Sequence, residues 1–384
     1  MRGLKVLGIL AITSPFSLAS DLRESLAAIS IGASFPGDAS YTSSSVAYNQ
    51  RFLYKPAGVV YPKSPQEVSE AIKIGSLHNL KVVARSGGHS YIANGLGGRN
   101  GSLVIDLNKL SKISVNSARG TAVIETGNRL GDVATALANN GRAIPHGTCA
   151  YGLRGSAPSF GIVTSYEVKT FPAPQSSTIF QYSWNLNFTA AAKGISAFQK
   201  FAQTDIPSQL GAEIVLGKGT TSGTVYFALS GGWYGNSQDL NAILLPFLRE
   251  MPPKPSTNIK RGSYIEGVIE LAGGSLDTKS APDTQDTFYA KSLTTPAKSP
   301  ISETAILAFT RYLAVTGFSS NTDWFIEIAL YGGKNSAINA VAPDATAFVH
   351  RSSLFTMQFY ASSQGRRPPF PSSGFGFVDG EPSM

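Results

Sequence analysis

Residues 81–107 read KVVARSGGHSYIANGLGGRNGSLVIDL, and this stretch decides the fold. Its apolar runs, Lys81–Ala84 and Ser102–Leu107, predict short strands on either side of a glycine-rich loop. Glycine lets a backbone approach a ligand closely, and successive loop N–H groups form an anion-binding hollow that suits a pyrophosphate. His89 is the side chain of this loop that is able to form a covalent bond. The alternative reading of these residues is a surface hairpin with an exposed histidine.

Two further motifs follow in order, Gly127-Asn128-Arg129-Leu130-Gly131-Asp132 and His146-Gly147-Thr148-Cys149. Together with Arg85–Tyr91 they resemble the berberine-bridge-enzyme-like branch of the flavin-dependent oxidases, and within it the secreted fungal oligosaccharide oxidases. The resemblance covers roughly residues 40–360. It implies an α+β, two-domain vanillyl-alcohol-oxidase fold, with a PCMH-type FAD-binding domain and a substrate domain.

The resemblance also implies how the cofactor is held. FAD would be attached twice, through His89 to the 8α-methyl group and through Cys149 to C6 of the ring. Tyr151 would line the site beside Tyr91. The implied cofactor-binding residues are Arg85, Ser86, Gly87, Gly88, His89, Ser90, Tyr91, Cys149, Ile162 and Val163. The expected substrate is an alcohol or an oligosaccharide, with molecular oxygen as the electron acceptor.

Composition and charge limit where the protein is located and which partners it binds. Residues 1–20 combine a basic start, a short apolar run and a small-residue end, which is typical of a signal peptide. We therefore expect export, and the sequons at Asn100 and Asn187 fit a secreted glycoprotein. The formal net charge of +8 is spread without a basic run, which argues against nucleic-acid binding. No apolar stretch is long enough to span a bilayer, and a monomer is expected.

Cys149 is the chain's single cysteine, so an internal disulfide is impossible. The thiol is either buried and inert or used in a bond to another group. The four histidines lack the paired spacing of a zinc site, so no metal is expected. His146 and Cys149 are also spaced to form half of a metal site, but the sequence offers no second half. A Cys149–His146 nucleophile pair is a further alternative, and the sequence shows no fold that would support it.

The expected domains are a leader at 1–20, the FAD-binding domain at 21–174, the substrate domain at 175–362 and a disordered tail at 363–384. The second domain is expected to be an antiparallel sheet with helices on one face. Glycine pairs at Gly231-Gly232 and Gly332-Gly333 suggest hairpin turns. The strands are expected at Thr178–Trp184, Ala212–Leu216, Thr224–Leu229, Trp324–Leu330 and Leu354–Tyr360, and the helices at Thr189–Thr204, Ser237–Met251, Tyr264–Ala272 and Glu303–Ala314.

Polar residues that alternate with apolar ones on the expected strands are candidates for substrate binding. These candidates are Glu213, Glu327 and Gln358, together with Tyr91 of the glycine-rich loop. The alternative is that the three sheet residues only form a solvated face. Trp233 and Trp324 are able to stack on sugar rings, although core packing is the commoner use of such residues.

The chain departs from the family pattern in three places. A glycine-rich stretch expected after Tyr151 is missing, the catalytic-base tyrosine expected after Tyr360 is absent, and Ala329 stands where relatives often carry an acid. No catalytic residue is therefore assigned. Two other possibilities stay open: an inactive, truncated paralogue or a faulty gene model, whose partial fold binds flavin weakly or not at all, and a secreted carbohydrate-binding or scaffold protein.

Overall fold

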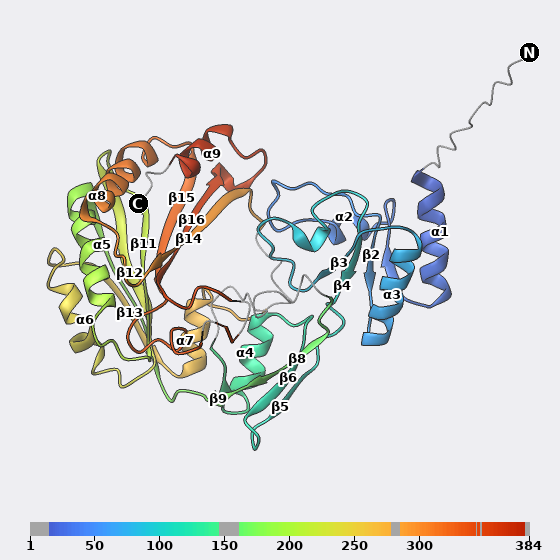
Figure 1. Ribbon diagram of the computed structural model, residues 1–384, viewed down its shortest axis with the longest axis horizontal. Coiled ribbons are helices and arrows are strands. Elements are labelled where there is room, and N and C mark those ends of the chain that lie inside the picture. The colour runs from blue at the N-terminus through green and yellow to red at the C-terminus, as the bar shows by residue number, and fades with distance from the viewer. Residues whose placement is uncertain (1–14, 146–160, 278–284, 343, 346–347, 381–384) are drawn as a thin grey trace, which may run out of the picture. The chain divides into compact units, whose positions relative to one another are not determined.

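The structure is a computed structural model that describes residues 15–145, 161–277, 285–342, 344–345 and 348–380 (Figure 1). The chain forms two compact units. The first unit comprises residues 1–47, 52–111 and 125–127, and the second comprises 48–51, 112–124 and 128–384. The expected domain boundary at residue 174 differs from this division, because α4 (Leu130–Ala138) packs against α7 (Tyr264–Leu271) inside the second unit.

The first unit is built on a four-stranded sheet in the order β1-β2-β4-β3. Strands β2 and β3 both pair with β4 in parallel, so β2, α3 and β3 form a βαβ unit. Ser64 caps α3 by accepting a hydrogen bond from the Glu67 backbone N–H at 3.1 Å. The Glu67 carboxylate accepts a hydrogen bond from the Lys63 backbone N–H, one residue before the N-cap. The elements are α1 (Pro15–Ala28), β1 (Gly32–Ser34), α2 (Tyr41–Ser44), β2 (Gly58–Tyr61), α3 (Pro65–Leu77), β3 (Val82–Arg85), η1 (Asn94–Leu96) and β4 (Leu103–Asp106).

The N-terminal helix α1 overlaps the expected signal peptide at residues 1–20. Residues 1–14 lie outside the described residues, and the expected cleavage position after Ser20 falls within α1. Leu22 and Leu26, which follow that position, are fully buried in the first unit. The signal peptide therefore stays a prediction. Leu22 and Leu26, the buried residues of α1 named above, belong to the expected mature chain.

The second unit begins with two small sheets, β5-β6-β8 and β7-β9. Its main element is a seven-stranded sheet in the order β13-β10-β12-β11-β15-β16-β14, and every pairing in it is antiparallel. The strands are β5 (Ile113–Asn116), β6 (Thr121–Glu125), β7 (Arg142–Ala143), β8 (Ser165–Lys169), β9 (Phe171–Pro172), β10 (Ser177–Asn187), β11 (Leu210–Lys218), β12 (Thr224–Trp233), β13 (Ser256–Gly262), β14 (Phe288–Pro296), β15 (Thr322–Leu330) and β16 (Ser353–Ser363).

One face of the seven-stranded sheet, here called the core face, is covered by helices (Figure 1). Alternate strand residues such as Ile214, Ile326 and Met357 are almost fully buried beneath them. The opposite face, here called the polar face, carries α7 at the β10–β13 corner. The prediction of an antiparallel sheet covered by helices on one face is confirmed for the described residues, except that the expected helix Tyr264–Ala272, seen here as α7, lies on the opposite face. The helices are α5 (Phe188–Ala202), α6 (Leu240–Leu248), α8 (Glu303–Tyr312), η3 (Leu313–Gly317), η4 (Gln364–Arg366) and α9 (Ser372–Asp379).

The glycine pair Gly231-Gly232 lies inside β12 and is not a turn, so that prediction is wrong. A Cβ built on Gly231 would stand 2.1 Å from the carbonyl oxygen of Gly211 on the neighbouring strand β11. Glycine is needed here because the two backbones approach closely, which is its other common use in strands.

The C-terminal residues 363–380 are ordered, which corrects the prediction of a disordered tail. Strand β16 runs to Ser363, and α9 packs against β14 and β16. Phe377 is 5% exposed and stacks on Tyr312, with the ring centroids 5.7 Å apart. The prolines of this segment hid the short apolar stripe of α9 from a periodicity argument. Residues 381–384 lie outside the described residues.

Replacing Phe377 with alanine should lower the free energy of unfolding by about 3–5 kcal/mol, because it opens a cavity under α9. Phe171→Ala is the matched control, since that side chain is 55% exposed and should change stability by less than about 0.5 kcal/mol. Urea denaturation of both variants measures the difference. Equal effects of the two substitutions would show that α9 does not pack on the sheet.

Candidate functional site

The loop Ser86–Tyr91 lies at the carboxyl end of strands β3 and β4. These strands are parallel, so the loop after β3 and the segment after β4 meet at one edge of the sheet. In open sheets with parallel strands, ligands bind at this edge. A third segment joins them, because Ser86 Oγ donates to the carbonyl oxygen of Thr126 and Gly127 N–H donates to Leu110 O at 2.8 Å.

Position 127 requires glycine because there is no room for a side chain. A Cβ built on it would lie 1.9 Å from Leu107 O and 2.7 Å from Leu110 O. The motif that begins at Gly127 therefore starts with a glycine for a steric reason. The sequence alone gave no sign of this contact.

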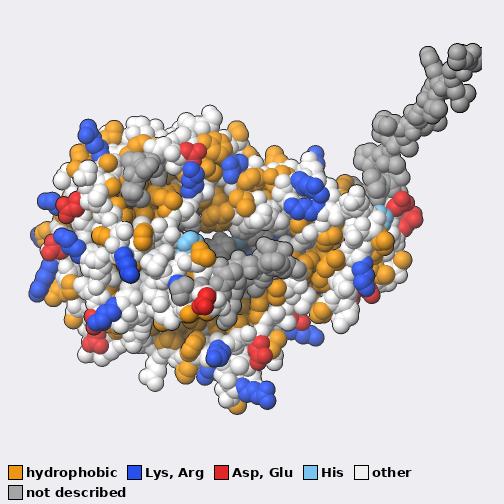
Figure 2. All heavy atoms as spheres, viewed as in Figure 1, with side chains coloured by type: hydrophobic (Ala, Val, Ile, Leu, Met, Phe, Trp, Pro, Cys, Tyr) orange, Lys and Arg blue, Asp and Glu red, His pale blue; other side chains and the backbone are white. Residues whose placement is uncertain are grey.

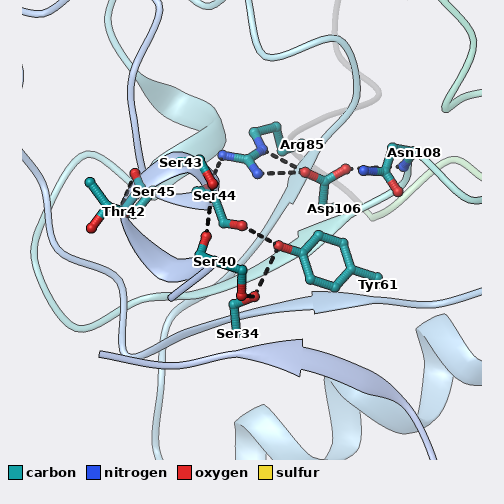
Figure 3. A network of polar contacts seen from close by, with 10 residues as sticks. All are labelled: Ser34, Ser40, Thr42, Ser43, Ser44, Ser45, Tyr61, Arg85, Asp106 and Asn108. Atoms are coloured by element: carbon teal, nitrogen blue, oxygen red, sulfur yellow. Dashed lines mark hydrogen bonds and ion pairs between the residues drawn. The ribbon is translucent and has the colours of Figure 1, made fainter. Parts of the chain in front are cut away.

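The side chain of Arg85 supports the loop from inside the first unit (Figure 3). Its Nε and Nη2 atoms donate to Asp106 Oδ2 at 2.9 and 2.5 Å, and Nη1 donates to the carbonyl oxygen of Ser44 at 2.6 Å. Asp106 is 7% exposed, so this is a buried ion pair. The Ser44 hydroxyl continues the network to Tyr61, whose hydroxyl reaches Ser34. The Arg85 guanidinium therefore anchors the start of the loop to β4 and α2.

Arg85→Met should destabilise the protein by about 3–5 kcal/mol, because it leaves the Asp106 carboxylate buried without its cation. Arg23→Met is the control, since the Arg23–Asp38 pair is 50% and 30% exposed and its loss should have a much smaller effect than the loss of the Arg85–Asp106 pair. Chemical denaturation of the two variants compares them directly. A loss of less than about 1 kcal/mol for Arg85→Met would contradict the buried network.

The backbone of the loop is suited to an anion. Within the described residues, the amides of Gly87, Gly88 and Ser90 donate no hydrogen bond to the protein. Gly88 has a φ of +79°, a conformation that turns successive N–H groups toward one side. Open amides of this kind cost free energy unless a ligand or water accepts from them. The loop thus fits the pyrophosphate of a dinucleotide.

The other expected cofactor residues are placed as follows. His89 and Tyr91 are half-buried on the same loop, in the first unit. Ile162 and Val163 are half-buried in the extended segment before β8, in the second unit. Cys149 and Tyr151 lie outside the described residues, as does the position of the expected deletion.

Strand register brings the three sheet candidates together on the polar face. Glu213 of β11 lies opposite Ala329 of β15, and Glu327 of β15 lies opposite Gln358 of β16. Residues opposite each other share a face, as do residues two apart on one strand, so Glu213 and Glu327 are diagonal neighbours. Ser230 of β12 lies opposite Glu213 on its other side and was not predicted.

The pKa values of both carboxyl groups are raised, and Glu327 contributes to the shift of Glu213. Burial, and secondly the negative charge of Glu327, raise the pKa of Glu213 to about 7. Burial also raises the pKa of Glu327. A pair of this kind holds a proton at a pH where exposed carboxylates are ionised. Together with Gln358 it offers both donors and acceptors to a neutral polyhydroxyl ligand.

The two tryptophan candidates belong to the core. Trp233 and Trp324 are 4% and 6% exposed, and both indole N–H groups donate to backbone carbonyls, of Asn236 and Gly317. Core packing is thus the correct alternative for these two residues.

Comparison with known proteins gives a consistent answer. Residues 56–169 match the model of an FAD binding domain. The glucooligosaccharide oxidase of Sarocladium strictum is 30% identical over 392 residues, which cover 87% of this chain and 77% of the relative. The chain belongs to the berberine-bridge-enzyme-like FAD-linked oxidases. The match confirms the family, the FAD-binding domain and the expected fold class.

Solved structures of this family agree. The glucooligosaccharide oxidase from Acremonium strictum superposes with a TM-score of 0.84 at 28% identity, over 94% of this chain and 86% of that one. Its FAD is 6-S-cysteinyl, 8α-N1-histidyl. The xylooligosaccharide oxidase from Myceliophthora thermophila C1, in complex with xylobiose, has a TM-score of 0.82 at 26% identity, over 94% and 86% of the two chains. The chain therefore has the two-domain α+β fold of these proteins.

The face of the molecule in Figure 2 carries Lys, Arg, Asp and Glu side chains scattered among apolar and polar ones. Lysine and arginine do not gather there into one basic patch. Among the described helices, none is both long and apolar enough to cross a membrane.

Proposed function

We propose that this FAD-linked oxidase is exported and oxidises a hydroxyl group of an oligosaccharide, with oxygen as the final electron acceptor. The observation that carries the proposal is the row of open amides at Gly87, Gly88 and Ser90, inside the matched FAD binding domain. Similarity to oxidases of gluco- and xylooligosaccharides supports the carbohydrate substrate. When bound, FAD supplies the two-electron acceptor for the substrate.

Different residues of this chain would bind the cofactor and the substrate. The loop amides hold the pyrophosphate, while His89 and Cys149 attach the flavin ring covalently. The relative with a cysteinyl, histidyl FAD supports this attachment. Tyr91, Glu213, Glu327 and Gln358 bind the sugar hydroxyl groups. Each carboxylate accepts a hydrogen bond from a sugar hydroxyl, and a protonated Glu213 also donates one.

The experiment is anaerobic mixing of the purified protein with cello-, chito- and xylooligosaccharides while the blue absorbance of the flavin is followed. Bleaching by one of these sugars, reversed when oxygen is admitted, is the expected result. A flavin that stays oxidised with all three would contradict oxidase activity. That outcome favours the inactive paralogue, because loss of a cofactor segment or of a general base lowers the rate by orders of magnitude.

A further inference from the structure

The sequon Asn187-Phe188-Thr189 lies on the surface, where β10 ends and α5 begins. Asn187 and Thr189 are exposed and Phe188 is half-buried. In the other sequon, Asn100-Gly101-Ser102, Ser102 is completely buried and donates to Leu96 O at 2.7 Å. The two sequons therefore differ in how the folded chain presents them.

The side chain of Asn187 is oriented by a second role. As the N-cap of α5, its Oδ1 atom accepts a hydrogen bond from Ala190 N–H at 2.8 Å. The Nδ2 atom makes no hydrogen bond within the described residues. Attachment of a sugar at Nδ2 leaves Oδ1 able to accept, so glycosylation and capping are compatible.

An apolar groove begins at this sequon. It has a volume of about 520 Å³ and is lined by Phe188, the middle residue of the sequon, and by residues of α8 and η3. Leu307 and Val315 in its lining are 41% and 47% exposed. Tyr312 and Arg311 also line the groove, and the Tyr312 hydroxyl donates a hydrogen bond to Phe377 O.

Hydrogen bonds fix the groove wall to the sequon. Phe188 N–H donates to Gly223 O at 3.2 Å, and Gly223 N–H donates to Ala314 O at 2.9 Å. Gly223 thus ties the start of α5 to η3, and α5 packs beside α8 on the core face of the sheet (Figure 1). A group attached to Asn187 starts next to Phe188, which is part of this groove.

We propose that Asn187 carries an N-linked glycan whose first sugars cover the groove formed by Phe188, Leu307 and Val315. The inference rests on the export included in the proposed function. In the secretory pathway, a lipid-linked oligosaccharide diphosphate is the donor. A bond forms between Asn187 Nδ2 and C1 of the first sugar, the bond from C1 to the diphosphate breaks, and Nδ2 loses a proton. The apolar faces of sugar rings pack well on aromatic and aliphatic side chains.

The test begins with the full chain exported from a eukaryotic host. Trypsin should release the peptide Thr170–Lys193 with a glycan at Asn187, detected by mass spectrometry before and after enzymatic glycan removal. Thr189→Ser keeps the sequon and should keep the glycan. Thr189→Ala removes the sequon and leaves the cap at Asn187 in place. Asn187→Asp, which also keeps a capping acceptor, should behave like Thr189→Ala.

Hydroxyl-radical footprinting then measures whether the glycan covers the groove. Oxidation of Leu307 and Val315 should be at least about twofold higher in Thr189→Ala than in Thr189→Ser, because the sugars no longer shield them. Leu293 of β14 is 51% exposed, lies outside the groove and should react equally in both. Equal oxidation of Leu307 and Val315 in the two variants would show that the glycan does not cover the groove.

The remaining outcomes are distinguishable. An exported chain with an unmodified Asn187 overturns this inference alone and leaves the proposed oxidase function standing. A chain that stays inside the cell without a glycan contradicts export, and this inference fails with it.

Discussion

A chain carrying both His89→Ala and Cys149→Ser is expected to release all of its flavin on denaturation, whereas either single variant retains it. The reason is that each residue is proposed to form one covalent bond to the same ring. Non-covalent contacts such as those of the loop amides are lost when the chain unfolds, and covalent bonds are not. The measurement is the flavin absorbance that remains with the polypeptide after denaturation and gel filtration.

His146→Ala is the matched control, because it changes the histidine that shares a motif with Cys149 and has no proposed bond to the flavin. It should retain flavin as the unaltered chain does. If His89→Ala alone releases all flavin, Cys149 forms no bond. If the double variant still retains flavin, another residue is the attachment point, and the proposed pair is wrong.

Glu213→Gln is expected to stabilise the protein above pH 7 by up to about 3 kcal/mol. The Glu213 pKa is about 7 in the folded chain against 4.5 ordinarily, so the folded state holds this proton more tightly than the unfolded state. Below about pH 4.5 both states are protonated and the group has no effect. As the pH rises from 4.5 to 7 the unfolded chain loses the proton first, so stability falls, and above 7 the whole penalty applies. A difference of 2.5 pKa units corresponds to about 3 kcal/mol.

Urea denaturation between pH 4.5 and 8.5 measures this effect. The gain from Glu213→Gln should grow with pH and vanish at the acid end. Glu327→Gln should lower the Glu213 pKa, because it removes the neighbouring negative charge. Glu266→Gln is the control of opposite sign, since hydrogen bonds from Ser263 lower the pKa of Glu266 and its carboxylate is stabilising at neutral pH. A Glu213→Gln gain independent of pH would contradict the raised pKa of Glu213.

Much of the fold could be predicted from local patterns. The strands around the glycine loop and the capped helix after Ser64 were recognisable because turn, cap and period signals agree there. The exposed edge strand β13 and the helix α9 were missed. In β13 only Ile259 and Gly262 are even partly buried, so the strand has no apolar alternation. In α9 the prolines that precede it dominate the local composition.

The candidate site was predictable in parts. Alternation placed Glu213, Glu327 and Gln358 on one face, because residues two apart on a strand share a face and the register aligned the strands. Sequence could not show that Glu213 and Glu327 are diagonal neighbours or that burial raises their pKa values. It also could not show the Arg85–Asp106 pair, since the two residues meet only through the parallel pairing of β3 and β4.

Peptide mapping of the unaltered protein examines the proposed double attachment of one flavin to His89 and Cys149 without any substitution. Trypsin should give the peptides Ser86–Arg99 and Ala143–Arg154 joined through a single flavin, with the mass of all three parts. Detection of that species is the predicted result. Recovery of both peptides unmodified, with His89 and Cys149 free, would contradict the account.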